Sequence, residues 1–155
     1  MTQQAVTNST CLIGLERIGQ LNLLPQVFST VFAPPTVVAE VSSPLSWLRV
    51  QAVQNTTVIA TLRTQMDAGE AETIALAMEL GDVILILDDK KARRVAQQIG
   101  LKVIGTVGML LRAKRQGVIA EINPLLTALV QADFRISDAI IREALRLSGE
   151  ENSPI

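Results

Sequence analysis

The sequence contains no histidine and no tyrosine, and its one cysteine is Cys11. Without histidine, catalysis of the Ser-His-Asp or Cys-His type and zinc binding through histidine are excluded. A single cysteine also excludes an internal disulfide. The groups that remain for chemistry are carboxylates, lysines, arginines and hydroxyls, together with any metal ion that carboxylates can bind.

Long apolar runs are missing as well. Runs such as "VILIL" are far shorter than the ~20 residues of a membrane-spanning helix. The N-terminal stretch "MTQQAVTNST" lacks the basic start and apolar core of a signal peptide. We therefore expect a cytoplasmic protein that does not enter a membrane. Its 155 residues are 48% hydrophobic and 19% charged, which is typical of one globular domain, here residues 1–155.

Positive charge is concentrated in the segment 88–117. This segment contains eight of the fourteen basic residues, which are Lys90, Lys91, Arg93, Arg94, Lys102, Arg112, Lys114 and Arg115. Its acidic residues are Asp88 and Asp89, so it carries a net charge of +6, and the rest of the chain carries −7. Such asymmetry indicates either an anionic partner or a solvated basic helix face.

Short apolar segments alternate with segments of helical periodicity. "VILIL" (83–87) is continuously apolar, as expected of a central parallel strand that is covered on both faces. Further strands are expected at 5–8, 31–35 and 102–106. Helices are expected at 11–21, 21–29, 36–41, 70–81, 90–100, 107–117, 122–134 and 137–149. The region 42–64 is ambiguous, and "TTVIATL" within it is a candidate strand.

Hydroxyl side chains are expected to cap the first and last of these helices. Ser9 or Thr10 precedes the first helix and Ser137 precedes the last. Strands that alternate with helices predict an α/β fold with a central, mainly parallel sheet flanked by helices.

Two adjacent acids, Asp88 and Asp89, directly follow "VILIL". In open α/β sheets, ligands bind beyond the carboxyl ends of the strands. One of the two aspartates could simply cap the following helix, where an acid also favours the helix dipole. One is enough for that purpose, so the second indicates a site.

Three further polar positions are candidates for the same site. Glu70 lies in the first turn of its helix, beside an apolar face formed by Ala71, Ile74, Ala75 and Met78, whereas Glu72 shares the solvent side with Glu79. Glu40 interrupts "TVVAEV", and Asn8 ends the first expected strand. The alternatives are a dipole-matching acid for Glu70, a solvated side chain for Glu40, and a turn residue or cap for Asn8.

The motifs resemble those of PIN-domain proteins, and most of all the VapC-like branch. They are "NSTCLIGLERIGQLNLL", "PPTVVAEV", "DAGEAETIALAMELG", "VILILDDKKARRVA" and "GTVGMLLRAKRQGVI", and they extend from Val6 to about Gly149. The resemblance implies a three-layer PIN-like fold, and a ribonuclease that uses Mg²⁺ or Mn²⁺. It also implies RNA as substrate, a small antitoxin protein as partner, and a homodimer.

The resemblance assigns roles by position. The catalytic group comprises Asn8, Glu40, Glu70, Asp88 and Asp89, of which Glu40, Glu70 and Asp89 bind the metal. Substrate contacts fall on Ser9 and Thr10 near the scissile phosphate, and on Lys90, Lys91, Arg93 and Arg94 along the RNA backbone. The mechanism implied is metal-assisted hydrolysis of the phosphodiester.

Asn8 departs from the family pattern, because an aspartate stands at this position in the proteins that the chain resembles. An amide oxygen carries no negative charge, which weakens metal binding. The change fits a natural pseudo-enzyme, a substitution that silences a toxic nuclease, or a site that works with three acids.

A second hypothesis is therefore a PIN-like module that binds RNA or protein without cutting. A receiver-like fold ranks lower, because Asp88 and Asp89 come too late in the chain.

Overall fold

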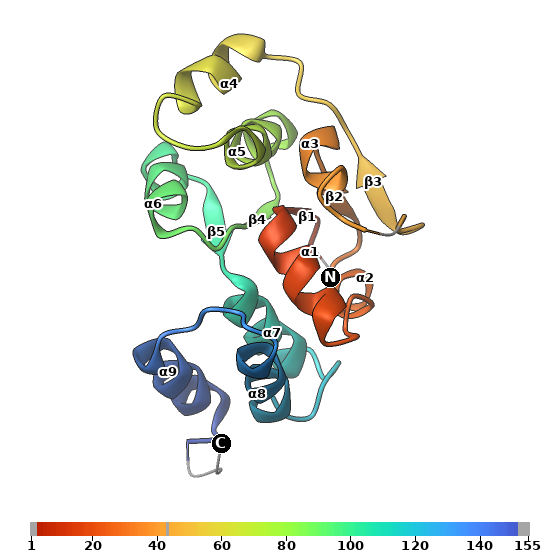
Figure 1. Cartoon of the computed structure of the whole chain (residues 1–155), viewed down its shortest axis with the longest axis vertical. Helices are drawn as coiled ribbons and strands as arrows, with labels where there is room; N and C mark the ends of the chain where they lie inside the picture. Colours follow the sequence, from red (N-terminus) through yellow and green to blue (C-terminus); the bar gives the residue numbers. More distant parts are fainter. Residues whose placement is uncertain (1–2, 43, 152–155) are drawn as a thin grey trace.

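The computed structural model describes residues 3–42 and 44–151, and within them five parallel strands form one sheet (Figure 1). The strand order is β3-β2-β1-β4-β5. The strands are β1 (Ala5–Thr7), β2 (Val31–Ala33), β3 (Leu48–Val50), β4 (Ile84–Ile86) and β5 (Lys102–Ile104). Each neighbouring pair is parallel, in registers such as Ala5 opposite Ile84. The expected α/β architecture is confirmed, and β3 is a strand that the sequence did not predict.

Helices connect the strands and cover the sheet. They are α1 (Ser9–Arg17), α2 (Leu23–Val27), α3 (Pro35–Val38), α4 (Thr56–Leu62), α5 (Ala68–Leu80), α6 (Lys90–Ile99), α7 (Thr106–Arg115), α8 (Asn123–Gln131) and α9 (Asp138–Ser148). In the described part of the chain, none of these helices has the length and apolar character that crossing a membrane requires.

The core has two parts, one on each face of the sheet. Ala5, Ile84 and Ile86 face a cluster that includes residues of α1, α2, α7, α8 and α9. Val6 and Leu85, which alternate with them, face a cluster with residues of α4, α5 and α6. Alternate strand residues point to opposite faces, so a strand covered on both faces must be apolar throughout. This is why "VILIL" has no polar position.

Side-chain caps correct two expectations about helix starts. Asn8, rather than Ser9 or Thr10, caps α1, because its Oδ1 accepts the N–H of Cys11 at 3.2 Å. "TTVIATL" is helix α4 rather than a strand, and Asn55 caps it by accepting the N–H of Val58 at 3.2 Å. Its β-branched residues favour a strand only weakly, and the Asn55 cap stabilises a helix instead. Ser137 caps α9 as expected.

The face assignment of α5 needs a correction as well. Met78, expected in the core, is 39% exposed. Glu72, expected in solvent with Glu79, is half-buried and accepts a hydrogen bond from the Thr36 hydroxyl. Thr73 is fully buried on the same helix. The helix is covered on most of its circumference by the sheet, α3 and α4, so no single apolar stripe marks its inner side.

Glu150 links the C-terminal end of the described chain to the start of α8 through hydrogen bonds. Its carboxylate accepts hydrogen bonds from Lys114 Nζ at 2.8 Å, from the N–H of Ile122 at 2.9 Å and from the N–H of Asn123 at 3.1 Å. Burial alone would raise the pKa of Glu150, but these hydrogen bonds outweigh it and lower the pKa to about 2. The ionised carboxylate therefore stabilises the fold.

We expect Glu150→Gln to lower the free energy of unfolding by about 2 kcal/mol at neutral pH. A depressed pKa contributes stability above the unfolded value of about 4.3 and loses it as the pH falls toward the folded value. The difference between wild type and variant should therefore shrink between about pH 4.3 and pH 2, as measured by urea unfolding at a series of pH values.

Glu143→Gln is the matched control, because Glu143 pairs with Arg146 at a fully exposed position and should matter little. An equal destabilisation by Glu150→Gln at every pH would show that the charge of Glu150 is not what stabilises the C-terminal end.

Candidate functional site

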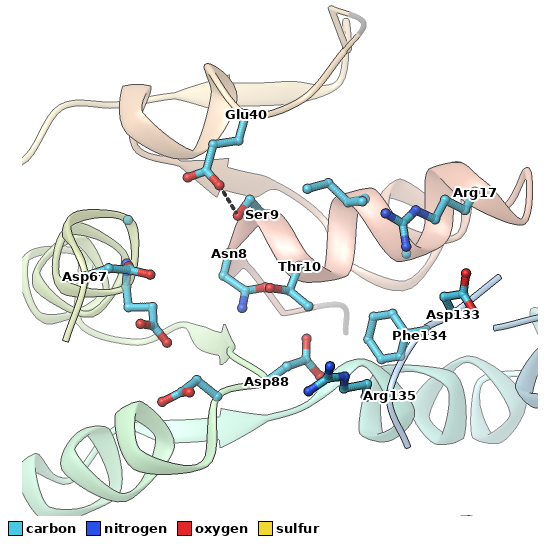
Figure 2. Close-up of a pocket in the computed structure, with 15 residues that line it drawn as sticks. Asn8, Ser9, Thr10, Arg17, Glu40, Asp67, Asp88, Asp133, Phe134 and Arg135 are labelled. Atoms are coloured by element: carbon cyan, nitrogen blue, oxygen red, sulfur yellow. Dashed lines mark hydrogen bonds between the residues drawn. The ribbon is translucent and has the colours of Figure 1, made fainter. Parts of the chain in front are cut away.

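A cleft of about 600 Å³ lies at the carboxyl ends of β1 and β4 (Figure 2). Its lining residues are Asn8, Ser9, Thr10, Ile13, Gly14, Arg17, Glu40, Asp67, Gly69, Glu70, Asp88, Asp89, Asp133, Phe134 and Arg135. They come from the whole length of α1, the turn after α3, the start of α5, the end of β4, and the loop between α8 and α9. This edge is where parallel sheets bind ligands.

Six carboxylates line this cleft. The structure brings together Glu40, Glu70, Asp88 and Asp89, as the sequence predicted, and adds Asp67 and Asp133. Asp67 was missed, although an aspartate three residues before Glu70 at the start of a helix is a recognisable capping pattern. Segments far apart in the chain thus contribute negative charge to one small volume.

Three of the lining side chains cap helices. Asn8 caps α1; Asp67 Oδ1 caps α5 by accepting the N–H of Glu70 at 2.8 Å; and Asp89 Oδ2 caps α6 by accepting the N–H of Ala92 at 2.9 Å. The positive ends of three helices therefore lie at the cleft. They favour negative charge there, from the protein itself or from a bound anion.

Asp88 connects the end of β4 to the start of α7. Its two oxygens accept the N–H and the hydroxyl of Thr106, both at 2.8 Å. Burial raises the pKa of Asp88, while the hydrogen bonds from Thr106 and the charge of Arg93 reduce the rise. Both oxygens of Asp88 are therefore engaged within the protein, whereas Asp89 is the exposed member of the pair.

Glu40 reaches the cleft from the turn after α3. Ser9 Oγ donates a hydrogen bond to Glu40 Oε2 at 3.1 Å, which ties the start of α1 to this carboxylate (Figure 2). A Cβ atom at Gly69 would lie 3.2 Å from Glu40 Oε1. The absence of a side chain at Gly69 thus lets Glu40 approach the start of α5.

Glu70 has the most perturbed carboxylate in the cleft. Burial raises its pKa first, and the negative charges of Asp67 and Asp89 raise it further, to about 7. A strongly perturbed carboxyl pKa in a cleft, caused by burial and by specific charged neighbours, is typical of functional sites.

The donor set of the cleft fits a hard divalent cation in its chemistry. It offers carboxylate oxygens and the amide oxygen of Asn8, which are the ligands that Mg²⁺ and Mn²⁺ prefer. Within residues 3–42 and 44–151, however, no three acidic or cysteine side chains lie close enough together to form a metal site. Sharing one ion would therefore require these carboxylates to turn inward.

The structure places only some of the predicted substrate-contact residues at the cleft. Ser9 and Thr10 line the cleft, whereas Lys90, Lys91, Arg93 and Arg94 of α6 do not. Three of these basic side chains are exposed, and Arg93 lines a second cavity.

The basic residues that do line the cleft are Arg17 and Arg135. Arg17 Nη1 donates a hydrogen bond to the carbonyl oxygen of Ala132 at 3.1 Å, so α1 holds the loop that carries Arg135. Neither arginine was predicted as a site residue. No motif in the sequence marks the loop 132–137 as part of a site.

We expect Glu70 to titrate near pH 7 in the metal-free protein. Asp89→Asn should lower this pKa, because asparagine still caps α6 but carries no negative charge. Carboxyl ¹³C chemical shifts between about pH 4 and pH 9 measure the pKa directly. Asp138→Asn, an Asp→Asn change outside the cleft, is the control.

The same pKa shift affects stability. A carboxyl pKa raised on folding means that the ionised group opposes folding, so the free energy of unfolding should rise as the pH falls from about 7 to about 4.3. Glu70→Gln should accordingly stabilise the metal-free protein above pH 7, by about 1 kcal/mol because solvent screens the partly exposed group. A variant that is less stable than wild type above pH 7 would contradict this account.

Comparison with known proteins identifies the family. The chain matches the family model DUF3368, described as a PIN domain, over residues 4–150. A search of curated protein sequences found no significant match. The match to the family model spans nearly the whole chain, including every segment that lines the acidic cleft. The chain therefore belongs to the PIN-domain family.

Proposed function

We propose that this protein is a metal-dependent ribonuclease of the VapC-like toxin type. One observation carries the proposal: in a PIN-domain chain, six carboxylates and Asn8 gather in one cleft at the carboxyl edge of the parallel sheet. Such a site has the charge and the oxygen donors for phosphodiester hydrolysis assisted by a divalent cation, and it requires no histidine.

Glu40, Glu70 and Asp89 would hold Mg²⁺ or Mn²⁺, with Asn8 and Asp88 beside them. A bound divalent cation supplies Lewis-acid stabilisation of the negative charge on the phosphodiester. Ser9 orients Glu40 through the hydrogen bond to Oε2. Asp88 is a positioning residue in this scheme, because Thr106 engages both of its oxygens.

The protein also supplies positive charge for the RNA backbone. The start of α1, with Thr10 in its first turn, directs its positive dipole end toward the cleft. Lys90, Lys91 and Arg94 are exposed on α6, which begins at Asp89, and can contact phosphates beyond the cleft. Such contacts are largely independent of sequence and weaken with salt.

The resemblance to the toxin branch supports two protein partners. These are a small antitoxin that holds the nuclease inactive and a second copy of the chain in a homodimer. A cytoplasmic location agrees with both proposals, because the toxins of this branch act on cellular RNA.

Asn8 favours a second candidate function, a PIN-domain module that binds RNA or protein without cutting. Asn8 is 4% exposed and uses Oδ1 to cap α1. Its amide contributes no charge to the cleft, so the cation would depend on the remaining carboxylates. Metal affinity and cutting activity separate the two candidates.

We expect the wild type to cut labelled single-stranded RNA slowly in Mn²⁺, and Asn8→Asp to cut at least tenfold faster, since a charged ligand replaces a neutral one. Asp89→Asn should abolish cutting in both backgrounds. Both substitutions preserve a helix cap, so a change in rate reports on charge rather than on folding.

Asp138→Asn is again the matched control and should cut as the wild type does. Loss of cutting on chelation of the metal, with recovery on adding Mn²⁺, would support the metal requirement. If neither wild type nor Asn8→Asp cuts any RNA, the nuclease proposal fails and the binding module takes its place.

We also expect Mn²⁺ to bind with a dissociation constant in the millimolar range or tighter. Asn8→Asp should tighten binding about tenfold and Asp89→Asn should weaken it by at least as much, because each changes the charge of the ligand set by one unit. Isothermal titration calorimetry measures both effects without RNA. Equal affinity in all three proteins would mean that Mn²⁺ binds outside this cleft.

A further inference from the structure

The wall of the cleft that faces the carboxylates belongs to the loop between α8 and α9. Phe134 and Arg135 lie on this wall, and Figure 2 shows Phe134 and Asp67 on opposite sides of the cleft. Phe134 is the one aromatic side chain among the described residues that line the cleft. An aromatic ring next to an arginine, across from a group of acids, has no role in the site described so far.

The Phe134 ring is held in place by contacts on both sides of the loop. The N–H of Phe134 donates to the carbonyl oxygen of Leu129 at 2.9 Å, and Asp133 before it adopts a left-handed conformation with φ of 65°. A Cβ atom at Gly14 would lie 2.6 Å from two ring atoms, so the ring packs directly on the backbone of α1. Arg17 fixes the loop through the carbonyl of Ala132. The ring is thus pre-positioned, which reduces the entropic cost of binding.

A second cavity continues from this wall. It has a volume of about 350 Å³ and lies between α9 and the β5–α7 segment, with Val107, Leu111 and Ile136 among its apolar lining residues. Phe134 and Arg135 line both cavities, so the two spaces meet at this loop. The volume falls in the range of pockets that hold small organic groups.

Arg93 adds an unsatisfied donor to the second cavity. Its Nε is buried and has no hydrogen-bond partner in the part of the chain that the structure describes. Buried polar atoms normally have a partner, so this N–H indicates that an acceptor is missing. The cavity therefore combines an aromatic ring, two guanidinium groups and apolar surface, and its lining also includes the carboxylates of Asp88 and Glu143.

We propose that Phe134 and Arg135 form a subsite for an unpaired RNA nucleotide adjacent to the scissile phosphate. The base lies against Phe134 at the mouth of the second cavity, and a phosphate lies at Arg135. This inference rests on the ribonuclease function proposed above and adds to it a requirement for an unstacked base.

The chemistry of a nucleotide matches that of the subsite. A base has a flat π-face that stacks on an aromatic side chain whatever its identity, and its phosphate suits the planar guanidinium of arginine. In a duplex the same faces are covered by neighbouring bases, so the ring can reach only an unpaired nucleotide. Arg135 and Arg17 bring positive charge to this side of the cleft, which Asp133 of the same loop partly offsets.

A protein could instead occupy the far end of the second cavity, where Ile140 and Leu147 are 47% and 59% exposed. Only the near end borders the acids and carries Phe134 with the arginines. The observations therefore favour a nucleotide at the near end.

The test is binding of a labelled single-stranded RNA and of its duplex, measured by fluorescence anisotropy without divalent metal, so that no cutting is needed. We expect Phe134→Leu to weaken binding of the single strand about tenfold and to leave duplex binding unchanged. Phe134→Tyr keeps the π-face and should bind as the wild type does. Arg135→Gln should weaken binding severalfold and reduce its salt dependence.

Arg142→Gln is the matched control, because it removes the same charge from an exposed position of α9 that lines neither cavity. An abasic nucleotide, placed at each position of the single strand in turn, measures the coupling between the base at that position and Phe134. At the position that stacks on Phe134, removing the base should cost the wild type about tenfold in affinity and cost Phe134→Leu little more, since the two changes remove one interaction.

Several results would overturn the inference. If wild type binds and cuts but Phe134→Leu and Arg135→Gln match it, the subsite is wrong while the nuclease function stands. If wild type neither binds nor cuts RNA, the proposed function and the subsite fail together. If substitution at Phe134 changes the molecular mass in solution rather than RNA affinity, the wall contacts another copy of the chain. Should Phe134→Leu fail to fold, Arg135→Gln at its exposed position still decides the question.

Discussion

Three of the helices that begin at the carboxyl edge of the sheet start at the cleft, and each start leaves backbone N–H groups that need an acceptor. Asn8, Asp67 and Asp89 supply these acceptors and also line the cleft. The fold and the candidate site therefore depend on the same side chains. The parallel sheet forces this arrangement for α1 and α6, because β1 and β4 end at the same edge and the helix that follows each of them starts there.

This dual use explains how Asn8 can stand where a family aspartate is expected. As a helix cap, asparagine is about as good as aspartate. The structure of the start of α1 is therefore preserved, and the substitution alters only the charge of the cleft. Capping of α1 requires a short side chain with an oxygen atom at this position, whereas binding of a metal ion would favour a negatively charged side chain. At position 8 the two requirements therefore favour different residues.

The cleft is electrically polarised although the whole chain carries a formal charge of −1. Carboxylates from the end of β4, the start of α5 and the turn after α3 form one wall, and the other wall carries Arg17 and Arg135 together with Asp133. Burial, together with repulsion from Asp67 and Asp89, raises the pKa of Glu70 to about 7. A divalent cation would relieve that repulsion, and a phosphate between the walls would meet positive charge on the second.

The sequence by itself determined the alternation of strands and helices, the buried character of "VILIL", and the acids at the strand ends, because these depend on local periodicity and on position relative to one strand. Local preference failed at "TTVIATL", where the cap from Asn55 and packing on α5 outweigh β-branched composition.

Only the tertiary structure decided that the loop after α8 completes the cleft and that the basic residues of α6 do not line it. The basic residues of α6 follow Asp89 directly, yet the helix directs them away from the cleft, whereas Phe134 and Arg135 reach it from the distant end of α8. No local rule connects position 134 to Gly14. Phe134 contacts α1 because Gly14 leaves room for the aromatic ring, and because the fold brings the loop after α8 next to α1.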